Sequence, residues 1–376
     1  MSVRVKVGWW SLICVVAAIA VTTSGIFAVQ ARQLDRRLIY AAVPGVGNET
    51  EHGGVGILVF DVNDHHKFVK RIQTWAAPRG QRDENIKGIA ASAQTGLLYV
   101  STIHRLAAFD LVTDKLVWQK GYDADCCDRM AVSPDGTLLY VPAFEESKWY
   151  VVDARTGGEI ATIKVAGSAH NTIYSPRGDR VYLASLSSPI LAVADPKTHR
   201  VIKQVGPFSA SIRPFTINGA ETRVYVNVNN LLGFEIGDLQ TGKVLQKVTV
   251  EGFKMGKVAH HGCPSHGIAL TQDESELWIA DGANSHLHVF DMTGAAPRQK
   301  TSIKVRDQPG WITFSIDGTR AYPSTGEVID VATKKTLATL EDENNRHVQS
   351  EKLLEVVFRN GKPVQTGDQF AIGMKR

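Results

Sequence analysis

Three histidines and a cysteine lie within seven residues in the segment His260-His261-Gly-Cys263-Pro-Ser-His266. Imidazole and thiolate groups bind Zn²⁺ and other transition metals, so His260, His261 and His266 are candidate ligands for a divalent transition metal. A structural zinc site needs four regularly spaced ligands, and His170 would have to complete this set from elsewhere in the chain. The alternative is a loop in which the histidines form hydrogen bonds and shape a surface.

A second chemistry needs no metal. His170 or His266 could act as a general base, because imidazole titrates near neutral pH. Arg213 could then neutralise a carboxylate or an oxyanion, since a guanidinium binds a carboxylate through two hydrogen bonds. This set would suit a carbohydrate-directed lyase or hydrolase, but the sequence contains no diagnostic lyase motif and no Gly-x-Ser-x-Gly. Binding without catalysis is therefore favoured, and the enzyme is the alternative.

These residues must be positioned by a repeated element, and its clearest marker is Asp-x-x-Thr. Full copies begin at Asp110, Asp153, Asp195, Asp238 and Asp330, and degenerate copies begin at Asp61 and Asp291. An Asp carboxylate accepts a hydrogen bond from the backbone two residues on, and a residue in the left-handed conformation can close the turn. Each copy predicts a tight turn between the third and fourth strands of a repeat.

The segment 125–165 shows one whole repeat. Four short apolar runs, at 130–133, 138–141, 149–153 and 159–165, are separated by turn residues. Runs of this length and composition are typical of strands joined by hairpins. A period of roughly 40 residues with four strands per repeat is the signature of a β-propeller. The sequence predicts an all-β, seven-bladed β-propeller of four-stranded antiparallel blades.

The two ends of the chain supply the last blade. Residues 37–75 contain three predicted strands, and one further strand is predicted at 352–358, followed by the segment 363–372. Pairing the N-terminal strands with this C-terminal strand would close the ring and leave no exposed edge. The six other blades are predicted to begin near Asn85, Cys126, Ser168, Ser209, Cys263 and Gln308.

The repeats resemble those of the exported bacterial propeller proteins named for their Tyr-Val-Thr-Asn repeat. The stretch Ser-Pro-Asp-Gly-Thr-Leu-Leu-Tyr-Val at 133–141 is the most specific part, and Val224-Tyr-Val-Asn227 is a second close copy. The resemblance covers nearly the whole chain after its first 31 residues. It implies the seven-bladed fold but not the activity, because such propellers include binding proteins, lactonases, lyases and electron-transfer subunits.

In a propeller, ligands usually bind at the end of the central channel where the innermost strands begin. Counting back from the inner turns places Gly88, Asp128 and His170 there, and aligning the aromatic strands adds Arg213, His266 and Gly310. Insertions at 76–85 and 251–263 and the long loop at 44–54 are expected on the same face, where loops on a rigid scaffold carry function. The predicted ligand-binding residues are Asp128, His170, Arg213, His261, His266 and Asp281.

The N-terminal segment 1–31 has an early basic region, an apolar run and small residues near Ala31. This pattern predicts an export signal, which leaves residues 32–376 as a single propeller domain in the periplasm or outside the cell. An uncleaved membrane anchor is the alternative, because about 20 apolar residues are enough to span a bilayer.

Composition narrows the partners. The net charge of +4 is small and dispersed along the 376 residues, which argues against nucleic acid. A small molecule, a carbohydrate or a protein is the expected partner of a monomeric chain.

The cysteines leave two pairings open in an oxidising compartment. Cys126 and Cys127 could form a vicinal disulfide and leave Cys263 free, or one of the pair could bond to Cys263.

Overall fold

The computed structural model describes residues 1–3, 35–47, 49–75, 84–123, 126–144 and 146–375. Residues 34–376 form one compact unit, and residues 1–33 form a separate unit of which only the first three are described. The predicted export signal therefore lies almost entirely outside the described residues. Within the described ranges, no helix is long and apolar enough to cross a membrane.

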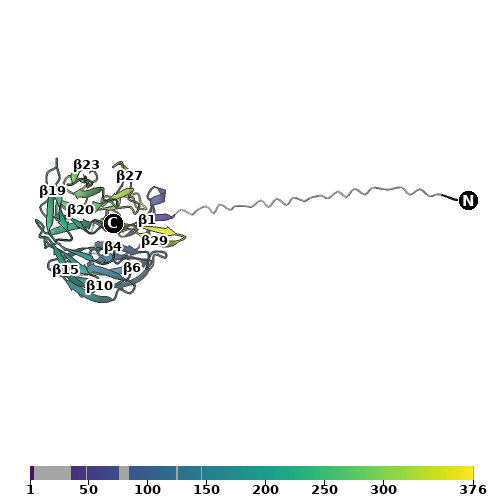
Figure 1. The fold of residues 1–376 in the computed structure, drawn as a ribbon, viewed down its shortest axis with the longest axis horizontal. Coiled ribbons are helices and arrows are strands. Elements are labelled where there is room, and N and C mark those ends of the chain that lie inside the picture. The colour runs from purple at the N-terminus through teal and green to yellow at the C-terminus, as the bar shows by residue number, and fades with distance from the viewer. Residues whose placement is uncertain (4–34, 48, 76–83, 124–125, 145, 376) are drawn as a thin grey trace. The chain divides into compact units, whose positions relative to one another are not determined.

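Seven antiparallel sheets are arranged around a centre, which confirms the all-β, seven-bladed propeller (Figure 1). The second, third and fourth blades comprise β4 (Ile86–Ser92), β5 (Leu97–Thr102), β6 (Leu106–Asp110) and β7 (Leu116–Lys120); β8 (Ala131–Val132), β9 (Leu138–Pro142), β10 (Lys148–Asp153) and β11 (Glu159–Lys164); and β12 (Ala169–Tyr174), β13 (Val181–Ser185), β14 (Leu191–Asp195) and β15 (Arg200–Val205). The fifth, sixth and seventh comprise β16 (Ile212–Ile217), β17 (Arg223–Val228), β18 (Gly233–Asp238) and β19 (Val244–Thr249); β20 (Ser265–Leu270), β21 (Glu276–Asp281), β22 (His286–Asp291) and β23 (Arg298–Lys304); and β24 (Ile312–Phe314), β25 (Arg320–Pro323), β26 (Glu327–Asp330) and β27 (Thr336–Thr339).

The Asp-x-x-Thr marker forms the predicted turn between the third and fourth strands. At the end of β18, the Asp238 carboxylate accepts hydrogen bonds from the backbone N–H groups of Gln240 and Thr241, both at 2.8 Å. Gly242 follows with a φ of 75°, the left-handed conformation that the turn requires. The Asp238 carboxylate thus accepts hydrogen bonds from N–H groups for which so short a loop has no backbone acceptor. The turn is stabilised, and β19 pairs with β18.

The hydrophobic core lies between neighbouring blades. Tyr99 of the second blade and Val141 and Tyr150 of the third are almost completely buried in one cluster. Burying an apolar side chain of this size stabilises the fold by roughly 1.5–3 kcal/mol. Because every blade contributes to two such contacts, the ring is a rigid frame for the starts of the inner strands.

The first blade is built from both ends of the chain, as the sequence predicts. It contains β1 (Arg36–Val43), β2 (Gly56–Asp61) and β3 (Lys67–Ile72), with the 3₁₀-helix η1 (Val62–Asp64) between the last two, and the C-terminal strands β28 (Leu353–Arg359) and β29 (Lys362–Thr366). The strand order β29-β28-β1-β2-β3 closes the ring. β29 is a fifth strand that the predicted four-stranded blade lacks. It forms because Asn360 and Gly361 both have positive φ, which suits a tight hairpin.

The C-terminal segment 367–375 crosses the channel at the end where the inner strands finish. The Leu270 N–H donates to the Ala371 carbonyl at 3.0 Å, and the Gly373 N–H donates to the Ile217 carbonyl at 2.9 Å. Figure 1 shows the C-terminus near the centre of the ring. The starts of the inner strands lie at the opposite end, so a site there has a floor of protein beneath it.

Two truncations separate the roles of the C-terminal strands and of this segment. A chain that ends at Lys352 loses the partner of β1, and we expect no cooperative unfolding transition because the ring cannot close. A chain that ends at Thr366 keeps β28 and β29 and should still unfold cooperatively, at a lower temperature than the full chain. Circular dichroism during heating measures both. An unchanged unfolding temperature for the shorter chain would show that ring closure does not depend on β28.

Candidate functional site

Four inner strands carry a β-bulge near their first residue. In β4, Ile86 and Gly88 pair with the consecutive residues Thr102 and Ser101, so Lys87 has no cross-strand partner. Equivalent irregularities place His170, Arg213 and His266 in bulges of β12, β16 and β20. Bulges redirect side chains and are frequent beside active sites. One end of the channel, here called the mouth, thus receives a basic or imidazole side chain from each of four blades.

Sequence counting missed Lys87 by one residue. The turn from Ser92 to Gly96 is one residue longer than the turn from Ser133 to Gly136, so counting back from the glycine gave Gly88. In six of the blades a polar residue stands at the end of the inner strand. The residue five positions before it lies at the mouth. The positions found in this way are Lys87, Asp128, His170, Arg213, His266 and Gly310.

Asp128 and His170 form a buried pair at the mouth. The Asp128 carboxylate and the His170 Nδ1 are in hydrogen-bond contact, while the His170 Nε2 lies 3.5 Å from the Arg129 Nη1. Arginine can only donate, so the ring carries its proton on Nδ1 and presents the lone pair of Nε2. Burial lowers the pKa of His170, and the nearby positive charges of Arg129 and Lys87 add to this. A neutral imidazole held by a carboxylate is the arrangement of a general base.

Arg129 connects this pair to an acidic residue that the sequence did not single out. Its Nη2 donates to the Glu351 Oε2, and its guanidinium lies 4.1 Å from the centre of the Trp311 ring. The Lys352 Nζ also donates to Glu351 Oε2, at 2.9 Å, and to the Gly45 carbonyl at 2.8 Å. Glu351 precedes β28, so ring closure brings it to the mouth.

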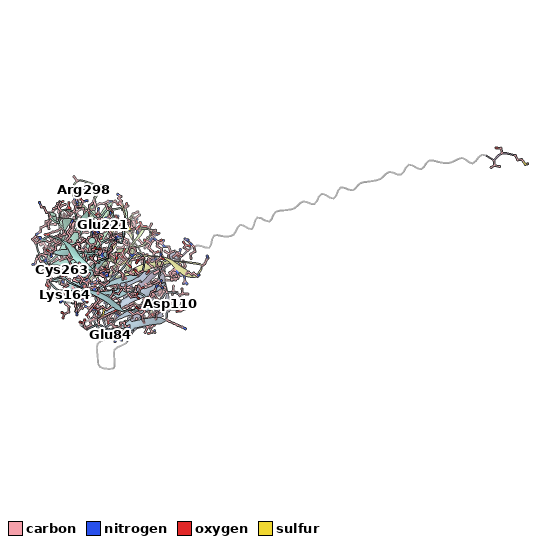
Figure 2. All side chains as sticks on the ribbon, turned by 60° about the horizontal axis from the view of Figure 1, so that its bottom comes forward. Glu84, Asp110, Lys164, Glu221, Cys263 and Arg298 are labelled. Carbon is pink, nitrogen blue, oxygen red and sulfur yellow. A yellow bond between two sulfur atoms is a disulfide. The ribbon has the colours of Figure 1, made fainter. Side chains whose placement is uncertain are left out.

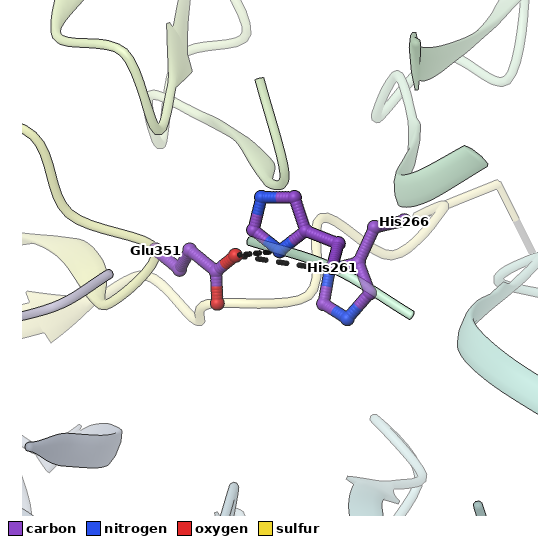
Figure 3. Close-up of side chains that lie close together, drawn as sticks. All are labelled: His261, His266 and Glu351. Carbon is purple, nitrogen blue, oxygen red and sulfur yellow. Dashed lines mark ion pairs between the residues drawn. The ribbon is translucent and has the colours of Figure 1, made fainter. Parts of the chain in front are cut away.

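Two histidines face the same carboxylate. The His261 Nδ1 lies 3.1 Å from Glu351 Oε1, and the His266 Nδ1 lies 3.8 Å from it (Figure 3). The two imidazoles stack with their centres 4.6 Å apart. His266 also donates from Nδ1 to the Gly310 carbonyl at 2.8 Å, which leaves its Nε2 with a lone pair. The cluster of His261, His266 and Glu351 could hold a metal ion.

The absence of a side chain at position 310 makes room for this cluster. A Cβ on Gly310 would lie 2.0 Å from His261 Nε2 and 2.5 Å from Glu351 Oε1, both far closer than atoms approach. Gly310 is the mouth position of the seventh blade, so a histidine from an inserted loop and a glutamate from the first blade occupy the space its side chain would fill.

Burial and charge set the protonation of the cluster. Burial lowers the pKa of His261 and holds that of His266 well below the usual range. Burial would raise the pKa of Glu351, but the nearby positive charges of Lys352 and Arg129 hold it well below its ordinary value. Burial lowers the pKa of Lys352 to about 8. At neutral pH the cluster contains neutral imidazoles and an ionised carboxylate.

Several buried polar atoms at the mouth have no hydrogen-bond partner among the described residues. They are Arg129 Nε, both side-chain polar atoms of Asn171, His261 Nε2 and Glu351 Oε1. Glu351 Oε1 is within ion-pair distance of His261 but lacks hydrogen-bond geometry. Buried polar atoms are normally satisfied by protein, water or a ligand, and leaving one unpaired costs about 1–3 kcal/mol. The mouth is therefore equipped to hold further polar atoms.

The remaining candidates contact residues outside the cluster of His261, His266 and Glu351. His260 points away from the His261 cluster and pairs with Glu49, the Nδ1 lying 2.8 Å from the carboxylate. This pair links the inserted loop at 251–263 to the loop at 44–54. Arg213 donates to Asn229 Oδ1 at 2.6 Å and to the Gly262 carbonyl at 3.3 Å. The buried Asp281 accepts from His288 Nε2 at 3.0 Å and from Asn284, partners within the sixth blade.

The disulfide pairs adjacent cysteines. Cys126 and Cys127 are bonded to each other, directly before Asp128. Cys263, labelled in Figure 2, is free and buried, and burial raises its thiol pKa to about 12. Of the two pairings that the sequence allows, the structure has the vicinal one. The insertion at 76–85 lies outside the described residues except for its last two.

Comparisons with known proteins add little to this geometry. No protein-family profile matches the chain, and a search of curated proteins finds no match. Among solved structures, hydrazine synthase from Kuenenia stuttgartiensis is similar with a TM-score of 0.45 and 14% identity, over 69% of this chain and 98% of that one. A similarity this low carries no conclusion about activity, and membership of the Tyr-Val-Thr-Asn repeat family stays a prediction.

Replacing Gly310 by alanine tests whether the cluster occupies its space. We expect the free energy of unfolding to fall by about 1–3 kcal/mol, because the methyl group would displace His261 or Glu351. Gly294→Ala is the matched control, since its Cβ would meet only the Ala296 carbonyl at 3.5 Å. Urea denaturation measures both variants. Equal stabilities for the two variants would contradict the crowding described above.

Proposed function

We propose that this propeller binds a small acidic ligand, of the carboxylate class, at the mouth of its channel. The observation that carries the proposal is an excess of positive charge among buried or half-buried side chains there. Four cations, Lys87, Arg129, Arg213 and Lys352, meet three carboxylates, Asp128, Asp281 and Glu351, which leaves one positive charge in excess when the histidines are neutral.

Lys87 and Arg213 are the two cations of the mouth that remain open to a ligand. Neither has an ion pair with any described residue, whereas Arg129 and Lys352 both pair with Glu351. Lys87 lies 4.2 Å from the centre of the Phe144 ring, and its charge influences Asp128, His170 and Lys352. An unpaired cation in a partly desolvated site gains most from a ligand with the opposite charge, and a guanidinium can hold a carboxylate through two hydrogen bonds.

A second candidate function is proton transfer on a bound acidic carbohydrate. The Asp128–His170 pair favours it, because the carboxylate fixes the tautomer, and the Nε2 lone pair could accept a proton once the Arg129 guanidinium, 3.5 Å away, turns to the ligand. A uronate-directed lyase would need such a base, together with cations that neutralise the sugar carboxylate. Binding is the primary proposal because charge excess supports it directly, whereas catalysis also needs a substrate placed at Nε2.

Calorimetric titration of the full chain with galacturonate oligosaccharides, and with neutral galactose oligosaccharides as the comparison, tests the primary proposal. We expect binding of the acidic series alone, weakening as salt is raised. Arg213→Gln should lower the affinity about 10- to 100-fold, the range for a hydrogen bond to a charged group. Arg298→Gln, on an outer strand where the side chain is 79% exposed, is the control and should change nothing. Equal binding of both series would contradict the proposal.

The same oligosaccharides decide between binding and catalysis. If the protein is a lyase, the full chain produces unsaturated sugar ends, and His170→Ala keeps affinity but loses turnover. His347→Ala is the control, because His347 is exposed on the seventh blade and pairs only loosely with Glu341 at 3.6 Å. A wild-type chain that binds but never cleaves would leave binding as the function.

We further propose that the protein is exported to the periplasm or secreted, with segment 1–31 as signal or anchor. The apolar N-terminal run and the Cys126–Cys127 disulfide support this, because disulfides persist in oxidising compartments. Sequencing the N-terminus of the protein recovered from cells distinguishes a cleaved signal from an anchor.

A further inference from the structure

We propose that His261, His266 and Glu351 bind a divalent transition-metal ion of the Zn²⁺ type at the mouth. The site would lie in the same vestibule as the acidic-ligand site proposed above, but it uses a different set of side chains. It differs from the sequence prediction in one ligand, because His260 turns to Glu49 and Glu351 takes its place.

The three side chains form a donor set that suits a transition-metal ion. One ligand atom from each of the three residues lies within 4.8 Å of the others, and all three side chains are buried. They come from two separate parts of the chain: His261 and His266 from the inserted loop and the start of β20 that follows it, and Glu351 from the turn before β28. Two imidazoles and a carboxylate are a common ligand set for Zn²⁺ and Fe²⁺, and three protein ligands leave positions open for water or a ligand.

Two buried polar atoms of this cluster lack a hydrogen-bond partner, which independently supports a bound ion. The Nε2 of His261 and the Oε1 of Glu351 are buried and have no hydrogen-bond partner among the described residues. Water cannot easily satisfy the histidine, because only 4% of the His261 side chain is exposed. His266 donates its Nδ1 proton to the Gly310 carbonyl, as metal-binding histidines usually do with their second nitrogen. Glu351 Oε1 lies 3.1 Å from the His261 Nδ1 and 3.8 Å from the His266 Nδ1, so metal binding requires the rings to turn a lone pair toward this oxygen.

The surroundings select the type of ion. Arg129 and Lys352 bind the second oxygen of Glu351, which fixes the carboxylate while leaving Oε1 toward the histidines. Their positive charges reduce the negative charge that the site offers a cation. An oxygen-seeking ion such as Ca²⁺ or Mg²⁺ would depend on that charge, whereas Zn²⁺ gains much of its binding from imidazole nitrogen.

The experiment uses the full chain, freed of metal with a chelator and titrated with Zn²⁺ by calorimetry and with Co²⁺ by visible absorption. We expect about one Zn²⁺ per chain and a Co²⁺ spectrum typical of nitrogen and oxygen ligands. His261→Ala and His266→Ala should each weaken Zn²⁺ binding by more than about tenfold. His260→Ala and His347→Ala are matched controls and should keep the wild-type affinity, because neither residue belongs to the cluster.

Near-ultraviolet circular dichroism of every metal-free variant checks that the fold is intact. Should His266→Ala fail this check, His261→Ala on the inserted loop decides the question. Absence of stoichiometric Zn²⁺ binding by the wild type would overturn the proposal, as would unchanged affinity in a folded His261→Ala chain. Titration of metal-free wild type with galacturonate oligosaccharides separates the two proposals: metal binding without acidic-ligand binding would support the metal site and refute the ligand site alone.

Discussion

The buried ion pair between Arg129 and Glu351 is the interaction on which the mouth depends. Both side chains are almost fully removed from water, with 3% and 6% of their side-chain surface exposed. An unpaired charge in such a place is costly, so Arg129 requires Glu351, which it shares with the equally buried Lys352. The pair also fixes the rest of the site, since Arg129 contacts His170 and Trp311 while Glu351 faces His261 and His266.

The propeller makes this arrangement possible by its symmetry and by its departures from symmetry. Repetition brings the starts of all inner strands to one end of the channel, and the C-terminal segment closes the other end. Bulges at Lys87, His170, Arg213 and His266 then redirect side chains that a regular strand would place elsewhere. Gly310 leaves one of the equivalent positions open, and the inserted loop fills it with His261.

The sequence predicts what depends on local pattern. The Asp-x-x-Thr turns, the aromatic-centred strands and the closure by both chain ends follow from period and turn chemistry, and all are present. Asp128, His170 and His266 were found because they lie at equivalent places in the repeat. Glu351 could not be found in this way, because it meets Arg129 across 222 residues and only ring closure joins them. The outward turn of His260 depends on Glu49, in a loop whose path the repeat does not determine.

A double-mutant cycle on Arg129 and Glu351 tests most directly whether this pair organises the mouth. The variants Arg129→Met, Glu351→Leu and their combination are compared by urea denaturation. Glu351→Leu should lose about 3–5 kcal/mol, because it leaves the buried Arg129 and Lys352 without a carboxylate. Arg129→Met should lose less, because Lys352 still pairs with Glu351, and the double variant should lose clearly less than the sum of the two. If the loss in the double variant equals the sum of the two single losses to within about 0.5 kcal/mol, the two charges act independently. That result would contradict the claim that this ion pair organises the mouth.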